Sequence, residues 1–525
     1  MANSTLHIAA CVYTALGHIR ALVAFISDLV DTRPNVVFTV FVYKSFFRKL
    51  EDEVNRWSLP DSAKSRIRLI GVSEIDAGEG LAALAVPLEE TAKCVPPAYA
   101  TVAAGGAVTC TSTGNVLDYS EIPAPRVALS DVMTPFVGQA LKAITPNVKL
   151  LVFWPLTHGY FNRFYGSKNI GGLAEWEEDT KSAMAEESNQ GRPFAEVARD
   201  VERRCPGGLY RSPDGWEAYD YELYPQEMPP GDISPIFMAS ISQARIMADG
   251  TVFACSEDFE PKSAHAIREW YERDMGKSVF FVGSRSVQRI LKEESPSKTG
   301  GVLEQREELH TFLKDKAAKS VWLISFGTFF YPFLHPSHVT ALIEALLESQ
   351  TPFIFAQASI MSTLAPLAPE FRERIVSSGL GHITEWVPQQ ELLQHPALGA
   401  FVTHGGANST LEAVAAGVVP IFWPFTTDQP FYATYLSQQL DCGFELIQVR
   451  TGPGAQQPRR GGIVQGTDEA VAGEVKEVIE CLGGEIGQKK RSNLAELRAR
   501  LTQSLELGGA ADSETEKFFA FLGGA

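Results

Sequence analysis

Residues 400–416 read AFVTHGGANSTLEAVAA, and this stretch decides how the rest of the chain is interpreted. Its first four residues form an apolar run typical of a buried strand, and the residues after Ser409 have the spacing of a helix. A histidine, two glycines and an Asn-Ser pair crowd the turn between them. In parallel α/β sheets, ligands bind beyond the carboxyl ends of the strands, where helix N-termini present free N–H groups. The stretch therefore predicts an α/β domain with an anion site at this strand end.

The composition of the turn suits a phosphate group. The paired glycines would let a bulky anion approach the backbone, while Asn408 and Ser409 would add side-chain donors beside the positive end of the helix dipole. A second interpretation uses the same residues: Ser409 and Glu412 have the spacing of a capping box, which would only satisfy the free N–H groups of the helix itself. The turn by itself leaves both interpretations open.

Apolar strands alternate with helical patterns in two separate parts of the chain. The strands lack a polar face, which is typical of a parallel sheet covered on both sides. In the first part we expect strands at 7–13, 36–43 and 67–72 and helices at 19–29 and 46–57. In the second part we expect strands at 320–327, 352–356, 400–403 and 418–423. The fold class predicted is α/β, with two doubly wound, Rossmann-like domains.

The boundaries follow from breaks in this rhythm. The polar stretch after Gly283 contains Pro-Ser-Lys-Thr-Gly-Gly and is expected to be a linker. Residues from about 155 to 250 are less regular and include an aromatic segment, so we expect an insertion there, either a lid or pocket wall or a solvated surface element. We therefore predict a first domain at 1–283, a linker at 284–319, a second domain at 320–505, and a C-terminal helix at 506–525 that packs back on the first domain.

Charge and cysteine usage restrict the class of protein. The 525 residues carry a formal net charge of −17 without a block of Lys and Arg, which argues against a nucleic-acid or anionic-membrane partner. The seven cysteines are scattered without a CxxC pair, as expected of reduced thiols. No signal-peptide pattern is seen, and no apolar run reaches the roughly 18–20 residues that span a bilayer. We expect a cytoplasmic monomer with no transmembrane segment.

A longer pattern surrounds the turn. From residue 386 the chain reads WVPQQELLQHPALGAFVTHGGANSTLE, and it continues with Ala416-Gly417, Trp423-Pro424 and Asp428-Gln429. This pattern closely resembles the signature box of the family 1 UDP-dependent glycosyltransferases, of the plant and fungal type that act on secondary metabolites. A looser resemblance covers the rest of the chain. It implies the GT-B fold, in which two Rossmann-like domains face each other across a cleft, and a UDP-sugar as donor substrate.

The resemblance implies a donor-binding role for residues along the box. Trp386 would stack on the uracil ring, a contact worth roughly 1–3 kcal/mol. The backbone of Val387 and the side chain of Gln389 would fix the base and ribose, and Glu412 would accept hydrogen bonds from the ribose hydroxyls. The diphosphate would be held by Thr328, His404, Gly406, Asn408 and Ser409, and hydroxyls of the sugar would be read by Asp428 and Gln429.

Two positions depart from the usual pattern of the family. Plant members carry Cys-Gly-Trp where this chain has Gly405-Gly-Ala407, so a tryptophan near the sugar is missing. The usual Asn after Asp-Gln is replaced by Tyr432, which is similar to the sterol glucosyltransferases at this point. Gln429 at the end of the box favours glucose as the donor sugar.

Glycosyl transfer needs a base that deprotonates the acceptor hydroxyl. The resemblance implies that His18, in Ala15-Leu-Gly-His18 after the first strand, is this base and that Asp131, at the end of the apolar segment 126–131, orients it. A carboxylate bonded to the far imidazole nitrogen would fix the tautomer and stabilise the imidazolium. Plainer interpretations are a polar helix-start residue for His18 and a helix N-cap for Asp131.

The implied reaction is a single in-line displacement with inversion, which gives a β-glucoside from UDP-glucose. No cofactor and no metal is expected, because the helix N-terminus and polar side chains would replace the metal and no Asp-x-Asp clamp stands at a strand end. The aromatic segment 160–165 and the habit of the family suggest a small apolar acceptor of phenolic, terpenoid or sterol-like kind.

Other functions stay open on the sequence alone. A UDP-sugar-binding protein without catalysis would use the same second domain, but it would not need His18 and Asp131. A nicotinamide-dependent oxidoreductase would need Gly-x-Gly-x-x-Gly after a strand, and the first strand is instead followed by TALGH. A transferase or epimerase that uses another UDP-sugar is the nearest rival, because a fold alone does not fix function.

Overall fold

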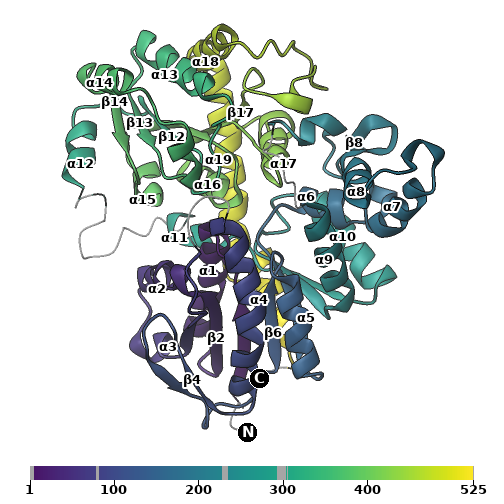
Figure 1. Cartoon of the computed structure of the whole chain (residues 1–525). Helices are drawn as coiled ribbons and strands as arrows, with labels where there is room; N and C mark the ends of the chain where they lie inside the picture. Colours follow the sequence, from purple (N-terminus) through teal and green to yellow (C-terminus); the bar gives the residue numbers. More distant parts are fainter. Residues whose placement is uncertain (1–4, 78–81, 228–233, 292–302, 304–305, 524–525) are drawn as a thin grey trace.

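The computed structural model describes residues 5–77, 82–227, 234–291, 303 and 306–523. It contains two parallel sheets, each covered by helices, which form a lower N-terminal half and an upper C-terminal half (Figure 1). The expected fold class, two doubly wound α/β domains, is confirmed. Part of the expected linker, 292–302 with 304 and 305, lies outside the described residues.

The N-terminal half is built on a seven-stranded sheet in the order β11-β10-β7-β6-β1-β2-β3. Its strands are β1 Leu6–Cys11, β2 Val36–Tyr43, β3 Ile67–Val72, β6 Val127–Asp131, β7 Lys149–Trp154, β10 Gly250–Phe253 and β11 Ser278–Phe281. All six residues of β1, including His7, are buried, as expected of a central strand in a parallel sheet covered on both faces. Because the strand order reverses between β1 and β6, the loops after these two strands leave the sheet in opposite directions and expose their carboxyl ends.

Helices cover both faces of this sheet. Their apolar stripes pack on the strands. The longest of these helices is α4, which stays helical although it contains three internal prolines. The helices are α1 Leu16–Thr32, α2 Phe47–Arg56, α3 Asp61–Lys64, α4 Ala82–Ala103, α5 Pro135–Ile144, α10 Pro261–Glu269 and α11 Gln288–Leu291. A small hairpin of β4 Ala107–Thr109 and β5 Val116–Asp118 lies at the edge of this half.

The C-terminal half contains a six-stranded parallel sheet in the order β14-β13-β12-β15-β16-β17. Its strands are β12 Val321–Ser325, β13 Phe353–Ala356, β14 Gly381–Thr384, β15 Leu398–Thr403, β16 Val419–Phe422 and β17 Phe444–Glu445. Its helices are α12 Glu307–Leu313, α13 Pro336–Glu348, α14 Pro369–Ser377, α15 Gln389–Leu393, α16 Ala407–Ala416, α17 Gln429–Thr434 and α18 Asp468–Gly483. Here the order reverses between β12 and β15, so the loops after them form the second exposed crevice.

The chain between β7 and β10 forms a separate set of elements at the side of the molecule (Figure 1). They are α6 His158–Tyr165, α7 Trp176–Met184, α8 Phe194–Arg203, the hairpin of β8 Leu209–Arg211 with β9 Glu217–Tyr219, and α9 Ser234–Met247. All but one of the residues of α6 are buried. The alternative of a solvated surface element is therefore wrong for this aromatic segment.

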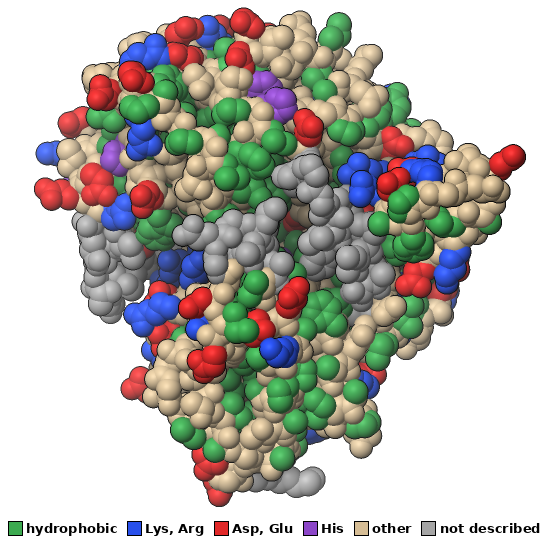
Figure 2. Space-filling view, viewed as in Figure 1, with side chains coloured by type: hydrophobic (Ala, Val, Ile, Leu, Met, Phe, Trp, Pro, Cys, Tyr) green, Lys and Arg blue, Asp and Glu red, His purple; other side chains and the backbone are tan. Residues whose placement is uncertain are grey.

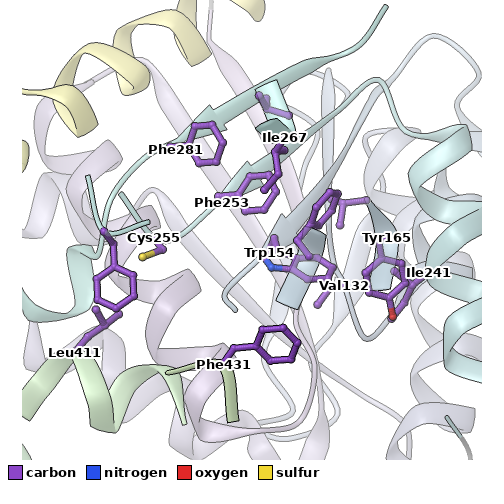
Figure 3. Close-up of a cluster of buried hydrophobic side chains, with 14 of the residues drawn as sticks. Val132, Trp154, Tyr165, Ile241, Phe253, Cys255, Ile267, Phe281, Leu411 and Phe431 are labelled. Atoms are coloured by element: carbon purple, nitrogen blue, oxygen red, sulfur yellow. The ribbon is translucent and has the colours of Figure 1, made fainter. Parts of the chain in front are cut away.

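The two halves share one hydrophobic core. Phe431 of α17 is fully buried, and its ring lies 5.6–6.1 Å from four rings of the N-terminal half, those of Tyr160, Phe164, Tyr210 and Trp216. Figure 3 shows Phe431 and Leu411 approaching Trp154 and Cys255 from the opposite side of this cluster. Aromatic rings at these separations favour the edge-to-face contacts seen here.

The C-terminal helices connect the halves a second time. α19 Glu485–Leu505 pairs Lys490 with Asp441 of the C-terminal half at 2.6 Å, and Ser504 near its end contacts Ser256 of the N-terminal half at 2.5 Å. The last helix, α20 Ala510–Phe521, places Phe518 against the N-terminal sheet, 5.5 Å from the ring of Phe280.

The surface shows no accumulation of one charge sign on the face in view, where acidic and basic side chains are interspersed (Figure 2). Within the part of the chain that the structure describes, no helix is both long enough and apolar enough to cross a membrane.

Candidate active site

The first part of the site is a histidine–aspartate pair at the reversal point of the N-terminal sheet. His18 lies in the first turn of α1, which follows β1, and Asp131 is the last residue of the neighbouring strand β6. Nδ1 of His18 lies 2.9 Å and 3.0 Å from the two carboxylate oxygens of Asp131. The carboxylate also accepts a hydrogen bond from the N–H of Met133, so its position is fixed. The structure thus brings together the two residues that the sequence singled out for catalysis.

The helix-cap interpretation of Asp131 fails, whereas His18 is indeed a polar residue in the first turn of α1. The N-cap of α1 is Ala15, and no side chain caps that helix. The N-cap of α5 is Thr134, so Asp131 does not cap the helix that follows it.

The environment of His18 prepares it to accept a proton. Burial alone would lower its pKa, but the charge of Asp131, its hydrogen bond and the more distant Asp428 hold the pKa of His18 above its ordinary value of 6.5. With Nδ1 held by Asp131, the other ring nitrogen, Nε2, makes no hydrogen bond to any residue within the described ranges. Nε2 is therefore the free basic position of the ring.

The second part of the site is the turn between β15 and α16. α16 begins at Ala407, its N-cap is Gly406, and no side chain caps it. The capping-box interpretation is therefore wrong, and the N-terminal N–H groups of α16 are left for another partner. Gly405 has a φ of 85°, a conformation that favours glycine, and a Cβ on Gly406 would lie 2.5 Å from the ring of His404. The backbone conformation favours glycine at 405, and the close approach of the His404 ring favours it at 406.

His404 lies at this turn as a neutral imidazole. Burial lowers its pKa to about 4, and its Nδ1 is a buried atom without a hydrogen-bond partner among the residues described. Thr328 lies in the turn that follows the adjacent strand, β12, and its side chain is exposed. The residue before it, Gly327, lies against the ring of His404, because a Cβ there would be 2.7 Å from that ring. Leaving a buried polar atom unpaired costs about 1–3 kcal/mol, so Nδ1 of His404 is suited to a ligand.

Asn408 joins the two halves. Its side-chain N–H donates a hydrogen bond of 2.7 Å to the carbonyl of Gly17, next to His18. The family resemblance implies only a diphosphate-binding role for Asn408, whereas in the structure it also joins the start of α1 to the start of α16. The turn for an anion and the histidine for a proton therefore lie side by side.

Glu412 is fully buried and is the centre of a network of donors. Its carboxylate accepts hydrogen bonds from Arg20 at 2.6 Å, from Gln389 at 2.6 Å and from Gln390 at 2.9 Å. Gln389 also donates to Oγ of Ser409 at 3.2 Å. Arg20 and Gln390 are functional candidates that the sequence reasoning missed. The signal for Arg20 was available, because it is the only Arg or Lys in α1 and lies two residues after His18.

Trp386 and Val387 lie just before α15, at the edge of this network. Trp386 is half-buried, and its ring pairs with no aromatic ring elsewhere in the described chain. The backbone N–H and C=O of Val387 likewise form no hydrogen bond within the described ranges. The ring face and these two backbone groups are available to a planar, hydrogen-bonding ligand such as a base.

Asp428 and Gln429 lie at the start of α17 after a strained turn. Thr427 has a φ of 57°, which is rare for a β-branched residue. Burial raises the pKa of Asp428 to about 6, and its Oδ2 has no partner among the described residues. Gln429 differs from the expectation, because its side-chain oxygen accepts hydrogen bonds from the N–H groups of Phe425 and Thr426. Tyr432 is buried beside them, with an unpaired hydroxyl.

Together these groups provide a free base, an anion-binding helix N-terminus, and buried polar atoms that face no protein partner. Within the described ranges, no group of three or more His, Cys, Asp or Glu side chains is arranged to hold a metal ion. The arrangement is suited to moving a proton beside a bound anion.

Comparisons with known proteins agree with this arrangement. Residues 304–445 match the family model described as "UDP-glucoronosyl and UDP-glucosyl transferase". The UDP-glycosyltransferase eriJ of Hericium erinaceus is 27% identical over 98% of this chain and 97% of its own length. The anthocyanidin 3-O-glucosyltransferase UFGT of Vitis vinifera is 34% identical, over 40% of each chain.

Solved structures support the same fold. A UGT transferase from Siraitia grosvenorii, solved in complex with UDP, superposes with a TM-score of 0.69 at 18% identity and covers 99% of this chain and 100% of its own. The match of residues 304–445 to the family model and the relative that aligns with nearly the whole chain together support a UDP-glycosyltransferase enzyme, and the solved structures show the same fold.

Proposed function

We propose that this enzyme transfers a sugar, glucose in our assignment, from a UDP-sugar to a hydroxyl group of a small apolar or aromatic acceptor, with inversion at the anomeric carbon. The observation that carries the proposal is the contact of 2.7 Å between Asn408 and the backbone of Gly17. It brings the anion-binding turn beside the His18–Asp131 pair, as a transfer with proton removal requires.

In the proposed step, Nε2 of His18 removes the proton from the acceptor hydroxyl as its oxygen attacks the anomeric carbon. The bond from that carbon to the diphosphate oxygen breaks, and UDP leaves from the opposite face. Asp131 stabilises the imidazolium that forms, as its double contact with Nδ1 suggests.

The diphosphate gains negative charge as it leaves. We assign its stabilisation to the N-terminus of α16, with Gly406, Ser409 and the side chains of Thr328 and His404. In this proposal no metal ion stabilises the leaving diphosphate. The unpaired Nδ1 of His404 serves as one of the hydrogen-bonding groups. Asn408 retains the second N–H of its side-chain amide for the same anion, since its contact with Gly17 uses only one of the two.

The rest of the donor is assigned along the same edge. Trp386 stacks on the uracil, Val387 and Gln389 fix base and ribose, and Glu412 receives the ribose hydroxyls. The unpaired carboxylate oxygen of Asp428 reads the sugar, aided by the amide N–H of Gln429, whose oxygen is already used.

We assign acceptor binding to the N-terminal half, residues 1–283 with 506–525, and donor binding to 320–505, joined through 284–319. The apolar acceptor is supported by relatives named for flavonols and anthocyanidins. We place the enzyme in the cytoplasm as a monomer, in keeping with its seven free cysteines.

Incubation of the full-length protein with UDP-glucose and a panel of phenols, terpenoids and sterols should release UDP and add one hexose to an acceptor, as measured by mass spectrometry. UDP-galactose, UDP-xylose and UDP-glucuronate in parallel reactions test the sugar. Product from one of these but not from UDP-glucose would correct the donor assignment. UDP binding with no product from any donor and acceptor would favour a binding protein.

Replacement of His18 by Ala should lower kcat by about 10²–10⁴-fold, the usual contribution of a general base. Calorimetric titration should show that the His18→Ala variant binds UDP with the same affinity as the parent enzyme, because His18 lies outside the assigned UDP contacts. Unchanged turnover would refute the assignment of the base.

The rate should depend on pH through the same residue. His18 must be neutral to act as a base, so kcat/KM should fall as the pH decreases through its raised pKa, above the ordinary 6.5. In Asp131→Asn the charge that raises this pKa is absent and burial lowers it, so the acid limb should move to lower pH while kcat falls. If the acid side of the pH profile of kcat/KM stayed at the same pH in Asp131→Asn, the assigned pairing of His18 with Asp131 would be contradicted.

Replacement of Trp386 by Ala should raise KM for the UDP-sugar by about 5- to 150-fold, equivalent to the roughly 1–3 kcal/mol of a base stack. Trp386→Phe is the matched control, because it keeps an aromatic face and should lose less. Equal losses in both variants would indicate that Trp386 acts by packing rather than by stacking on the base.

A further inference from the structure

Arg20 is a buried cation from the N-terminal half that reaches the assigned donor site. It lies on α1 two residues after His18, and its side chain is 14% exposed. One guanidinium nitrogen lies 2.6 Å from Glu412 and another 3.3 Å from Glu53 of α2, and both carboxylates are buried. The third nitrogen, Nε, is a buried atom with no hydrogen-bond partner among the residues described.

Arg20 is also the only basic partner of Glu412 within the described chain. The other two donors to Glu412 are the neutral amides of Gln389 and Gln390. A buried carboxylate needs a paired charge to stay ionised, and an ionised carboxylate accepts hydrogen bonds more strongly than a neutral acid. The charge of Arg20 therefore supports the acceptor capacity of Glu412.

The two carboxylate oxygens of Glu412 offer about four acceptor positions, of which three are occupied by hydrogen bonds from Arg20, Gln389 and Gln390. At least one position is left for a ligand hydroxyl. The approach of Arg20 from α1 keeps the carboxylate turned so that this position lies beside Gln389 and Ser409.

We propose that Arg20 is a positioning residue for the ribose of the donor, supplied across the interface by the half that carries the base. It pairs with Glu412 and holds that carboxylate oriented for the 2′-hydroxyl, without touching the sugar or the reacting atoms. The inference rests on the proposed function insofar as Glu412 is assigned to the ribose. It goes beyond that assignment by making ribose recognition depend on both halves.

The test compares the binding of UDP with that of 2′-deoxy-UDP by calorimetry, so it does not require turnover. The parent enzyme should prefer UDP by about tenfold or more, the size of one hydrogen bond to a charged group. In Arg20→Ala this preference should fall close to one, and Arg20→Lys should restore part of it. Glu412→Gln should also abolish the preference, and the double variant should lose no more than either single one.

Arg56→Ala is the matched control. Arg56 pairs with Glu53 at 3.1 Å, so this change removes the other cation beside Glu53 and leaves the pair of Arg20 and Glu412 intact. Its preference for UDP should equal that of the parent enzyme. Circular dichroism and melting curves of each variant would identify loss of fold, in which case Arg20→Lys and Glu412→Gln carry the test.

The outcomes separate the inference from the proposed function. Retention of the full preference in Arg20→Ala would overturn the role of Arg20 while leaving the donor assignment intact. Tighter UDP binding in Arg20→Ala would overturn it as well, by showing that the ion pair competes with the donor. A parent enzyme that does not bind UDP would overturn the donor assignment, and the inference with it.

Discussion

The site depends on two helix N-termini that are held against each other, that of α1 from one sheet and that of α16 from the other. Each helix starts where the strand order of its sheet reverses, so each has an open crevice in front of it. Each N-terminus carries roughly half a positive charge, and two of them in contact would repel. The buried carboxylates of Asp131, Glu412 and Asp428 lie at this contact and offset that charge. These three acidic residues thus stabilise the contact between the two helix N-termini.

The carboxylates also couple the two titrating groups of the site. Asp428 contributes to the raised pKa of His18, and His18 in turn lowers the pKa of Asp428, which burial has raised to about 6. Loss of the proton from Asp428 therefore makes His18 a better proton acceptor. In the proposed reaction, a hydrogen bond from a sugar hydroxyl would favour the ionised form of Asp428. The charge of Asp428 in turn keeps the pKa of His18 raised, so donor binding and proton removal support each other.

The sequence allowed the parts of the site to be predicted where a local pattern fixes the position. The strand-turn-helix at 400–416 predicted the anion turn, whereas the pairing of His18 with Asp131 was implied by the family resemblance and not by a local pattern. Contacts between distant segments could not be predicted in this way. No local pattern tells that Asn408 donates to Gly17 or that Arg20 pairs with Glu412, because these contacts exist only once the two halves have docked. The bonds of the Gln429 oxygen to the N–H groups of Phe425 and Thr426 were not predicted for a different, local reason, because they form within the turn that contains the positive φ of Thr427.

The burial of the aromatic segment at 160–165 follows from that docking as well. Its rings look like a pocket wall in the sequence, but in the folded chain they surround Phe431, which α17 inserts from the other half. The same short helix carries Gln429 and begins after Asp428, the residues assigned to the donor sugar. Because Gln429 and Phe431 lie on one short helix that begins after Asp428, the rings of the N-terminal half fix the position of the residues assigned to the sugar. Under the proposed assignment, substitutions of these rings should therefore affect donor binding as well as the N-terminal half.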